Sequence, residues 1–388
     1  MSVQKVIWTL NQLSGFGIQK FKRLRETLSD LETLLNPDVL SELRLSPEWG
    51  ADCVTRFQAL LESGDFEREE ERCTKVGVRI LTLLDSDYPK NLASIYDPPL
   101  VLYVKGSFIP EDQVAIAIVG SRHPTTYGLR SSNRFAQELA ERGVTIVSGF
   151  ARGVDGEAHR GALKAKGRTI AVLGCGLDII YRKEHASRYE EILASGAIIS
   201  EFPLGSPPQA FNFPKRNRII GGLSMGVLVV EASQRSGSLI TARIAAEEGR
   251  EVYAIPGPID SIASDGTNQL IQSGAKLVMH AEDILEDLAP QIRAALPELV
   301  HLSEPTQKES EDSVSSSVSL ETPFHNDGCQ DPVLKLLANQ PLSFDEIAVG
   351  LEENPATIRS RMTQLELKGV VKRIFGGRYV RNQASSDT

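Results

Sequence analysis

Three short apolar runs, at 115–119, 144–147 and 169–173, alternate with two segments of helical periodicity. This alternation is typical of βαβ units in a parallel sheet. A glycine stands at or just after the end of each run. Because parallel strands joined by right-handed crossovers all end at one edge of a sheet, we expect the loops that follow these strands to converge at that edge.

The three loops read G-S-R at 120–122, S-G-F-A-R-G at 148–153 and G-C-G at 174–176. Their glycines permit close backbone approach to a ligand, and the N–H groups at the start of each following helix favour an anion. The loops match neither the dinucleotide-binding pattern G-x-G-x-x-G nor the phosphate loop of ATPases. They predict a phosphate site of another kind, with Arg122 close to the ligand.

Further strands are predicted at 197–200, 227–230 and 251–255, with helical text between them. Two more, at 78–84 and 100–104, should lie at the margin of the sheet. The predicted fold class is therefore α/β, with a Rossmann-like, doubly wound, mostly parallel sheet over residues 77–285.

Both flanks of this core have a different character. Residues 1–70 predict a helical domain, with a G-x-G turn at 15–17 that fits a helix-hairpin-helix DNA contact as well as it fits a plain helical turn. Residues 286–330 are acidic and Ser-rich and predict a flexible linker. A capping box at 343–346 and a glycine-turn hairpin at 370–381 predict a winged helix over residues 331–383.

The formal net charge of -9 argues against a polyanionic partner, but the charges are unevenly distributed. Residues 301–330 carry six carboxylates and one lysine, whereas residues 359–381 carry seven cations and one carboxylate. Local fields decide whether a polyanion binds. The winged helix could therefore contact DNA, although such domains also bind proteins.

A basic and aromatic stretch, F-N-F-P-K-R-N-R, occupies residues 211–218 directly before an apolar helix. Aromatic rings among cations suit a single strand whose bases stack while its phosphates are neutralised. Cations at a helix N-terminus oppose the macrodipole, which favours an anion at this position. Small polar residues at 231–238 extend the predicted site, although helix capping alone also explains serines there.

Motifs of known catalysts and metal sites are missing from the sequence. Neither H-E-x-x-H nor G-x-S-x-G occurs, His159 is interpreted as structural, and Asp155 as a helix N-cap. The four cysteines form no C-x-x-C pair. We therefore expect no enzyme activity, metal or cofactor. With no signal-like or membrane-spanning segment in view, we expect a cytoplasmic protein without membrane contact.

Taken together, the motifs AIVGSR, VSGFARGVDGEAH, AVLGCGLDIIY, FNFPKRNRIIGGLS and VVEASQRSGSLITA closely resemble the DNA-processing protein A family (DprA or Smf) across residues 77–285. The resemblance implies a homodimer that binds single-stranded DNA, protects it and loads the RecA recombinase onto it during natural transformation. It implies DNA contacts by Ser121, Arg122, Ser148, Gly149, Gly153, Phe213, Lys215, Arg216 and Asn217. Neighbouring residues complete the predicted site: Gly120, Phe150, Arg152, Arg218, Ser236 and Ser238.

Two other functions compete with this interpretation. Phosphoribohydrolases that cleave nucleotides share a related sheet, but their PGGxGTxxE motif is replaced here by P-G-P at 256–258 and G-T-N-Q at 266–269. A sequence-specific repressor that uses the winged helix would leave the glycine-rich loops of the core without a role. Both alternatives rank below single-stranded DNA binding.

Overall fold

A computed structural model describes residues 2–28, 30–46, 49–179 and 186–295, together with 342–343, 347, 351, 358, 365, 371–373 and 378–381. The chain divides into two compact units, residues 1–307 and 308–388, and each is considered by itself.

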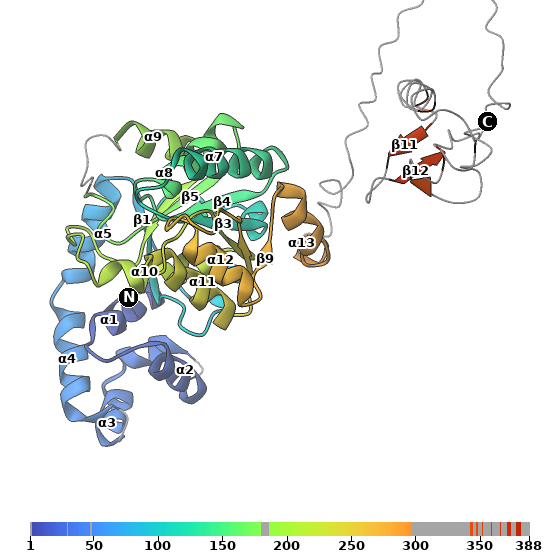
Figure 1. Ribbon diagram of the computed structural model, residues 1–388. Coiled ribbons are helices and arrows are strands. Elements are labelled where there is room, and N and C mark those ends of the chain that lie inside the picture. Colours follow the sequence, from blue (N-terminus) through green and yellow to red (C-terminus); the bar gives the residue numbers. More distant parts are fainter. Residues whose placement is uncertain are drawn as a thin grey trace, which may run out of the picture. The chain divides into compact units, whose positions relative to one another are not determined.

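The first unit is built on a nine-stranded sheet of the order β1-β2-β6-β5-β4-β3-β7-β8-β9 (Figure 1). Its seven parallel strands are β3 (Ala115–Val119), β4 (Thr145–Ser148), β5 (Thr169–Leu173), β6 (Ala197–Ser200), β7 (Gly226–Val229), β8 (Glu251–Ala254) and β9 (Lys276–Leu277). The other two, β1 (Val78–Thr82) and β2 (Val101–Gly106), are antiparallel at one margin. The predicted doubly wound α/β fold is confirmed, and the short strand β9 is an addition to it.

Helices cover both faces of the sheet. One face carries α7 (Thr126–Glu141), α8 (Val154–Lys164), α9 (Ala186–Ser195) and α13 (Ala281–Ala295). The other carries α6 (Lys90–Ala93), α10 (Asn212–Leu223), α11 (Gly237–Glu247) and α12 (Asp265–Gln272). Alternate residues of β3 face opposite layers: Ile116 packs with α7, whereas Ala117 packs with α10. A strand buried on both faces in this way reads as a continuous apolar run.

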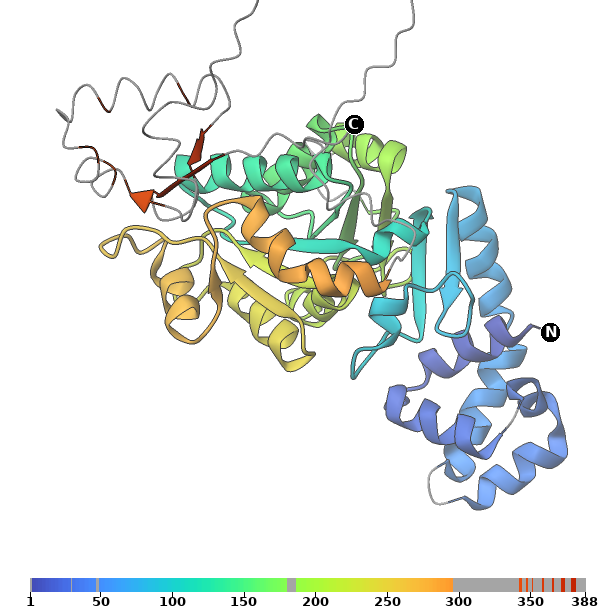
Figure 2. The ribbon, with the colours of Figure 1, turned by 90° about the vertical axis from the view of Figure 1, so that its right-hand side faces the viewer.

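The N-terminal segment is helical, as predicted, and lies beyond the β1 side of the sheet (Figure 2). It consists of α1 (Val3–Gln12), α2 (Ile18–Thr27), η1 (Leu31–Leu35), α3 (Pro37–Leu45), α4 (Gly50–Glu62) and α5 (Asp65–Lys75). Trp8 donates a hydrogen bond of 2.9 Å to the Tyr103 hydroxyl on β2, and both residues belong to one hydrophobic cluster. The segment therefore shares a core with the sheet instead of forming a separate lobe.

The predicted boundary at residue 285 is wrong, because α13 continues to Ala295. Ile284 and Leu288 are buried and Ile292 is partly buried. At this helical spacing they form one apolar face of α13, which packs in the same hydrophobic cluster as α7. The prediction missed this face because Pro290 and the acidic residues around it resemble a linker. The remainder of the predicted linker, residues 296–330, lies outside the described residues.

The second unit contains a small antiparallel sheet in which β12 (Arg378–Arg381) lies between β10 (Leu342–Ser343) and β11 (Val371–Arg373). The predicted hairpin of β11 and β12 is confirmed. Ile347, Leu351, Ile358 and Leu365 are helical. Most of the predicted capping box at 343–346 lies outside the described residues.

Candidate nucleic-acid interface

The sheet has a topological switch point beside β3. The chain leaves β3 for β4, β5 and β6 on one side, and returns for β7, β8 and β9 on the other. Open α/β sheets bind ligands at such a point, outside the carboxyl ends of the strands. A pocket of about 500 Å³ lies there, and eight of the predicted site residues line it: Gly120, Ser121, Arg122, Phe213, Arg216, Asn217, Ser236 and Ser238.

The loop after β3 is fixed by the strands and helices on both of its sides. The Ser121 N–H donates to the Glu231 carbonyl at 2.7 Å, and the Ser121 carbonyl accepts from the Val154 N–H at 3.1 Å. A Cβ at Gly120 would lie 2.7 Å from a Val154 methyl carbon and 2.9 Å from the Glu231 carbonyl oxygen, so this position requires glycine. The loop therefore presents the exposed Arg122 from a rigid base.

Glu231 also organises the start of α7. Its buried carboxylate accepts from the Thr125 N–H at 2.8 Å and from the Thr125 hydroxyl at 2.6 Å. Thr125 is in turn the N-cap of α7. Glu231 belongs to the polar stretch at 231–238 but is not among the predicted site residues. Glu231 could be recognised in the sequence as an acidic residue directly after a buried strand, at the edge where the loops converge.

A cation and an aromatic ring meet at the mouth of the pocket. The Arg122 guanidinium carbon lies 5.3 Å from the centroid of the Phe213 ring. Phe213 rests on the glycine loop after β5, because a Cβ at Gly174 would lie 3.1 Å from the ring. Phe211, at the N-cap of α10, is 69% exposed. One phosphate group and one or two bases could thus be held side by side.

The floor of the pocket is charged but buried. Arg216 is 4% exposed, and a Cβ at Gly149 would lie 1.9 Å from its Nη1 and 2.7 Å from the Asp155 carboxylate. Burial raises the pKa of the Asp155 carboxyl, and the positive charge of Arg216 opposes this increase. Gly149 thus leaves the space in which the guanidinium and the carboxylate lie together.

The interpretation of Asp155 as an N-cap is wrong. The N-cap of α8 is Gly153, at a positive φ of 78° that favours glycine, and Asp155 lies inside the first turn. Its carboxylate turns back to accept from the Ala151 N–H at 3.4 Å and lines the pocket. His159 is structural, as expected: it is buried, with its Nδ1 2.7 Å from the Thr169 hydroxyl.

The remaining predicted residues do not line the pocket. Ser148 is buried and donates to the Ile118 carbonyl at 2.7 Å, and the buried Phe150 packs edge-on against His159 and Tyr189. Their side chains are part of the support beneath the loop, as is Gly153, which packs against Ser121. Arg152 is exposed on the same loop.

Lys215 and Arg218, on α10, both interact with Glu201. The Lys215 ammonium lies 3.6 Å from the Glu201 carboxylate and 5.7 Å from the centroid of the Phe202 ring. The Arg218 guanidinium is largely buried, lies 2.5 Å from Glu201 and reaches Asp97 at 3.2 Å. Neither residue lines the pocket, and the Lys215 side chain is about half-exposed.

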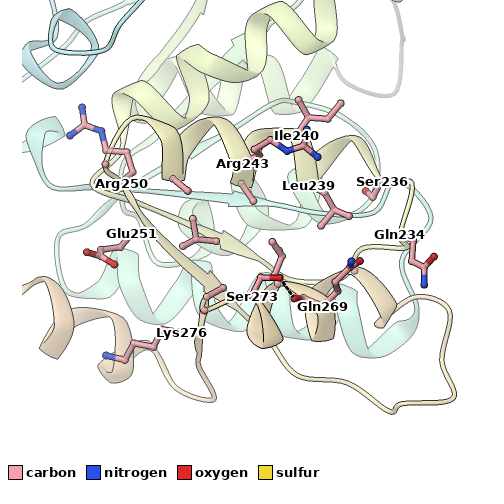
Figure 3. A pocket seen from close by; sticks show the side chains of 18 of the residues that line it. Gln234, Ser236, Leu239, Ile240, Arg243, Arg250, Glu251, Gln269, Ser273 and Lys276 are labelled. Atoms are coloured by element: carbon pink, nitrogen blue, oxygen red, sulfur yellow. Dashed lines mark hydrogen bonds between the residues drawn. The ribbon is translucent and has the colours of Figure 1, made fainter.

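A second hollow, of about 1000 Å³, lies between α11 and α12 (Figure 3). Its lining mixes Arg243, Arg250 and Lys276 with Glu251 and Asp287. Lys276 is paired with Asp287 at 2.8 Å, and Arg250 donates to the Asn91 carbonyl at 2.8 Å. Because both signs of charge are present, this hollow is less suited to a polyanion than the pocket beside β3.

The sequence matches the family model of DNA recombination-mediator protein A over residues 79–289 and that of the DprA winged helix domain over residues 319–377. The chain belongs to the DNA recombination-mediator protein A family. Protein Smf of Escherichia coli is 43% identical over 301 residues, which cover 76% of this chain and 75% of that protein.

Two solved structures of DprA proteins resemble this one. DNA processing protein A from Streptococcus pneumoniae has a TM-score of 0.63 and 38% identity, and the match covers 74% of this chain and 98% of that one. The Helicobacter pylori protein has a TM-score of 0.50 and 33% identity, with 55% and 96% covered, and its structure is described as giving insights into a unique single-stranded DNA binding mode. Among the described residues, no helix is long and apolar enough to cross a membrane.

Proposed function

We propose that this DprA protein binds single-stranded DNA in the pocket beside β3. The observation that carries the proposal is Arg122 stacked over Phe213 at the mouth, above the buried guanidinium of Arg216. A base stacked on Phe213 or Phe211 brings its phosphate close to Arg122. Stacking and charge neutralisation act on every base, so the binding depends little on sequence.

A single strand fits this site better than a duplex does. The half-buried Phe213 ring can stack only with a base that has left its own helical stack, and unpairing a duplex costs a few kcal/mol for each base that is turned out. The binding mode described for the Helicobacter pylori relative supports the same choice.

The protein acts by binding and not by catalysis in this proposal. Asp155 is the carboxylate that lines the pocket, and it is held beside Arg216 and the Ala151 N–H. In the stretch that replaces the phosphoribohydrolase motif, the Asn268 side chain hydrogen-bonds both the N–H and the carbonyl of Gly257, at 3.3 and 3.1 Å. Asn268 thus braces a loop, and Leu270 stands where the motif has its glutamate.

We also propose that the protein forms a homodimer and transfers its bound strand to the RecA recombinase during natural transformation. The support is membership of a recombination-mediator family and the similarity to DprA proteins. The residues of these two interfaces are not assigned.

A competition experiment tests the central proposal. Binding of a labelled oligo(dT) to the full-length protein is followed by fluorescence anisotropy, with unlabelled oligo(dT) or blunt duplex as competitor. We expect the single strand to compete far better than the duplex. Equal competition by the duplex contradicts the proposal, and release of free base from nucleotides incubated with the protein favours the enzyme. RecA filament growth on DNA, measured with and without the protein, tests the transfer step.

A further inference from the structure

A second cationic surface lies outside the pocket, in a groove of about 360 Å³ between α7 and α8. Four cations line it, two from each helix: Arg130 and Arg134 from α7, and Arg160 and Lys164 from α8. All four residues are exposed, and the amides of Asn133 and Gln137 are also in the lining. No carboxylate lines the groove within the described residues.

The cations are brought together by the close approach of the two helices. A Cβ at Gly161 on α8 would lie 2.3 Å from the Asn133 carbonyl oxygen and 2.8 Å from the Ala136 Cβ, so α8 packs directly on α7 at this point. Side chains that flank the contact on both helices therefore reach the same groove. One extended ligand could touch cations from both helices.

The arrangement of charges costs stability in the free protein. Arg130 and Arg134 are four residues apart on one helix, and so are Arg160 and Lys164 on the other. Like charges at this spacing destabilise a helix, whereas opposite charges stabilise it. Glu138 and Glu157 lie near Arg134 and Arg160, at 3.8 and 2.5 Å. Arg130 and Lys164 have no carboxylate within ion-pair distance in the described part of the chain.

The groove starts four residues after Arg122 in the sequence, at the end of α7 that follows the loop after β3. From Thr126 its lining follows one face of α7 through Leu129 and Asn133 to Gln137. At about 1.5 Å of rise per residue this path is roughly 17 Å long. In the part of the chain that the structure describes, no aromatic residue lines it, so it is suited to phosphates and not to bases.

We propose that the α7–α8 groove holds the sugar-phosphate backbone of the DNA strand that leaves the pocket. This inference rests on the proposed binding of single-stranded DNA and adds a second segment to its path. The pocket stacks bases and neutralises the first phosphates, and the groove neutralises further phosphates without reading bases. The affinity contributed by the groove therefore requires a strand longer than the pocket itself.

The test compares a short and a long oligo(dT), of about six and about 30 nucleotides, which bracket the usual site sizes of single-strand binders. The variant R130A/K164A removes the two cations that lack a carboxylate partner. The control K90A/R293A removes the same charge from exposed positions on α6 and α13 that do not line either site. Affinity is measured against salt concentration for each full-length protein.

With the long strand, we expect the slope of log affinity against log salt to become shallower by about 1.4 in R130A/K164A, because two phosphates lose their cations. We expect no change with the short strand, and none for the control with either strand. Thermal unfolding should show a melting temperature equal to or above that of the wild type, because like-charge repulsion has been removed.

The variant R122A, which removes a cation from the pocket, is measured alongside. The inference is overturned if R130A/K164A has the wild-type salt slope on the long strand while the slope of R122A is shallower. It is also overturned if the variant loses as much affinity for the short strand as for the long one, since the cations would then act on the pocket itself. If the wild-type protein binds neither strand, the proposed function fails and the inference fails with it. If the groove binds an acidic protein and not DNA, the first of these results is expected: R130A/K164A then has the wild-type slope on the long strand.

Discussion

Arg122 and Phe213 lie in contact, with the guanidinium carbon 5.3 Å from the ring centroid, although Arg122 follows β3 and Phe213 is on α10. Neither residue could be paired with the other from local sequence. The loop after β3 and the start of α10, which follows β6, lie at the same edge of the parallel sheet. The fixed loop at Gly120 and the glycine at 174 leave the space that the pair occupies. A ligand that enters this contact meets a charge and a π-face together.

Replacing each member of the pair should have a different effect on DNA binding. R122A should make the single-strand salt slope shallower by about 0.7, because one phosphate contact is lost. F213A should weaken binding by about 1–3 kcal/mol with little change in slope, because stacking releases few ions. R122K keeps the charge and serves as the control, so its slope should stay close to that of the wild type. Anisotropy titrations across a salt series measure all three, and an unchanged R122A slope contradicts the phosphate role.

Gly149 and Gly237 are a matched pair of glycines at the pocket: Gly149 lies against the lining residues Arg216 and Asp155, and Gly237 lines the pocket itself. A Cβ at Gly149 would collide with the confined guanidinium of Arg216, whereas nothing lies within 4 Å of a Cβ at Gly237. G149A should therefore displace Arg216 and weaken single-strand binding by tenfold or more, on the order of 1.4 kcal/mol. G237A, in the first turn of α11, should leave binding intact and stability unchanged or slightly higher. Similar affinities for the two variants would mean that the position of Arg216 does not matter.

Bound DNA should stabilise the variant D155N more than it stabilises the wild type, because Arg216 and Asp155 are buried together. D155N removes the carboxylate beside the buried Arg216 guanidinium and should lower stability by about 3 kcal/mol, the lower end for a broken buried pair. A bound phosphate then replaces the missing negative charge. We expect saturating oligo(dT) to raise the melting temperature of D155N by more than that of the wild type. An equal increase for both proteins would argue that the strand does not approach Arg216.

R216A should behave differently from R122A. Arg216 is almost fully buried, so its removal leaves the Asp155 carboxylate in a poorly solvated site without its neighbouring charge. We expect a loss of stability as well as of affinity, and a double-mutant cycle with D155N should show strong coupling in thermal unfolding. Additive losses would place the two charges in independent environments.

The sheet and the position of the site were predictable because both depend on short-range patterns. Apolar runs such as 115–119 are buried on both faces, and a glycine after each strand marks the edge where loops meet. The exposure of individual side chains was not predictable. Phe150 and Phe213 both belong to the predicted site, yet the first is buried against His159 and the second lines the pocket. That difference arises from the packing of α8 and α9, which no local pattern encodes.

Charge was the least predictable property of the site. Arg216 and Arg218 are two residues apart on α10 and look equivalent in the sequence. In the structure Arg216 lines the pocket, whereas Arg218 is paired with Glu201 and the half-exposed Asp97 and does not line it. The carboxylates that distinguish the two arginines come from distant parts of the sequence, so only the folded arrangement shows that Arg216 lines the pocket and that Arg218 does not.

Truncation after residue 307 should leave a folded protein that still binds single strands. The pocket, the sheet and the N-terminal helices all belong to the first compact unit, and the hydrophobic cluster that joins Trp8 to Tyr103 lies within it. We expect residues 1–307 to retain cooperative thermal unfolding and an oligo(dT) affinity close to that of the full chain, apart from any part contributed by the basic hairpin at 371–381. Circular dichroism melting and anisotropy titrations measure the two properties. A truncated protein that unfolds cooperatively but binds no single strand would locate the main site in the winged helix, and would contradict the assignment of DNA binding to the pocket beside β3.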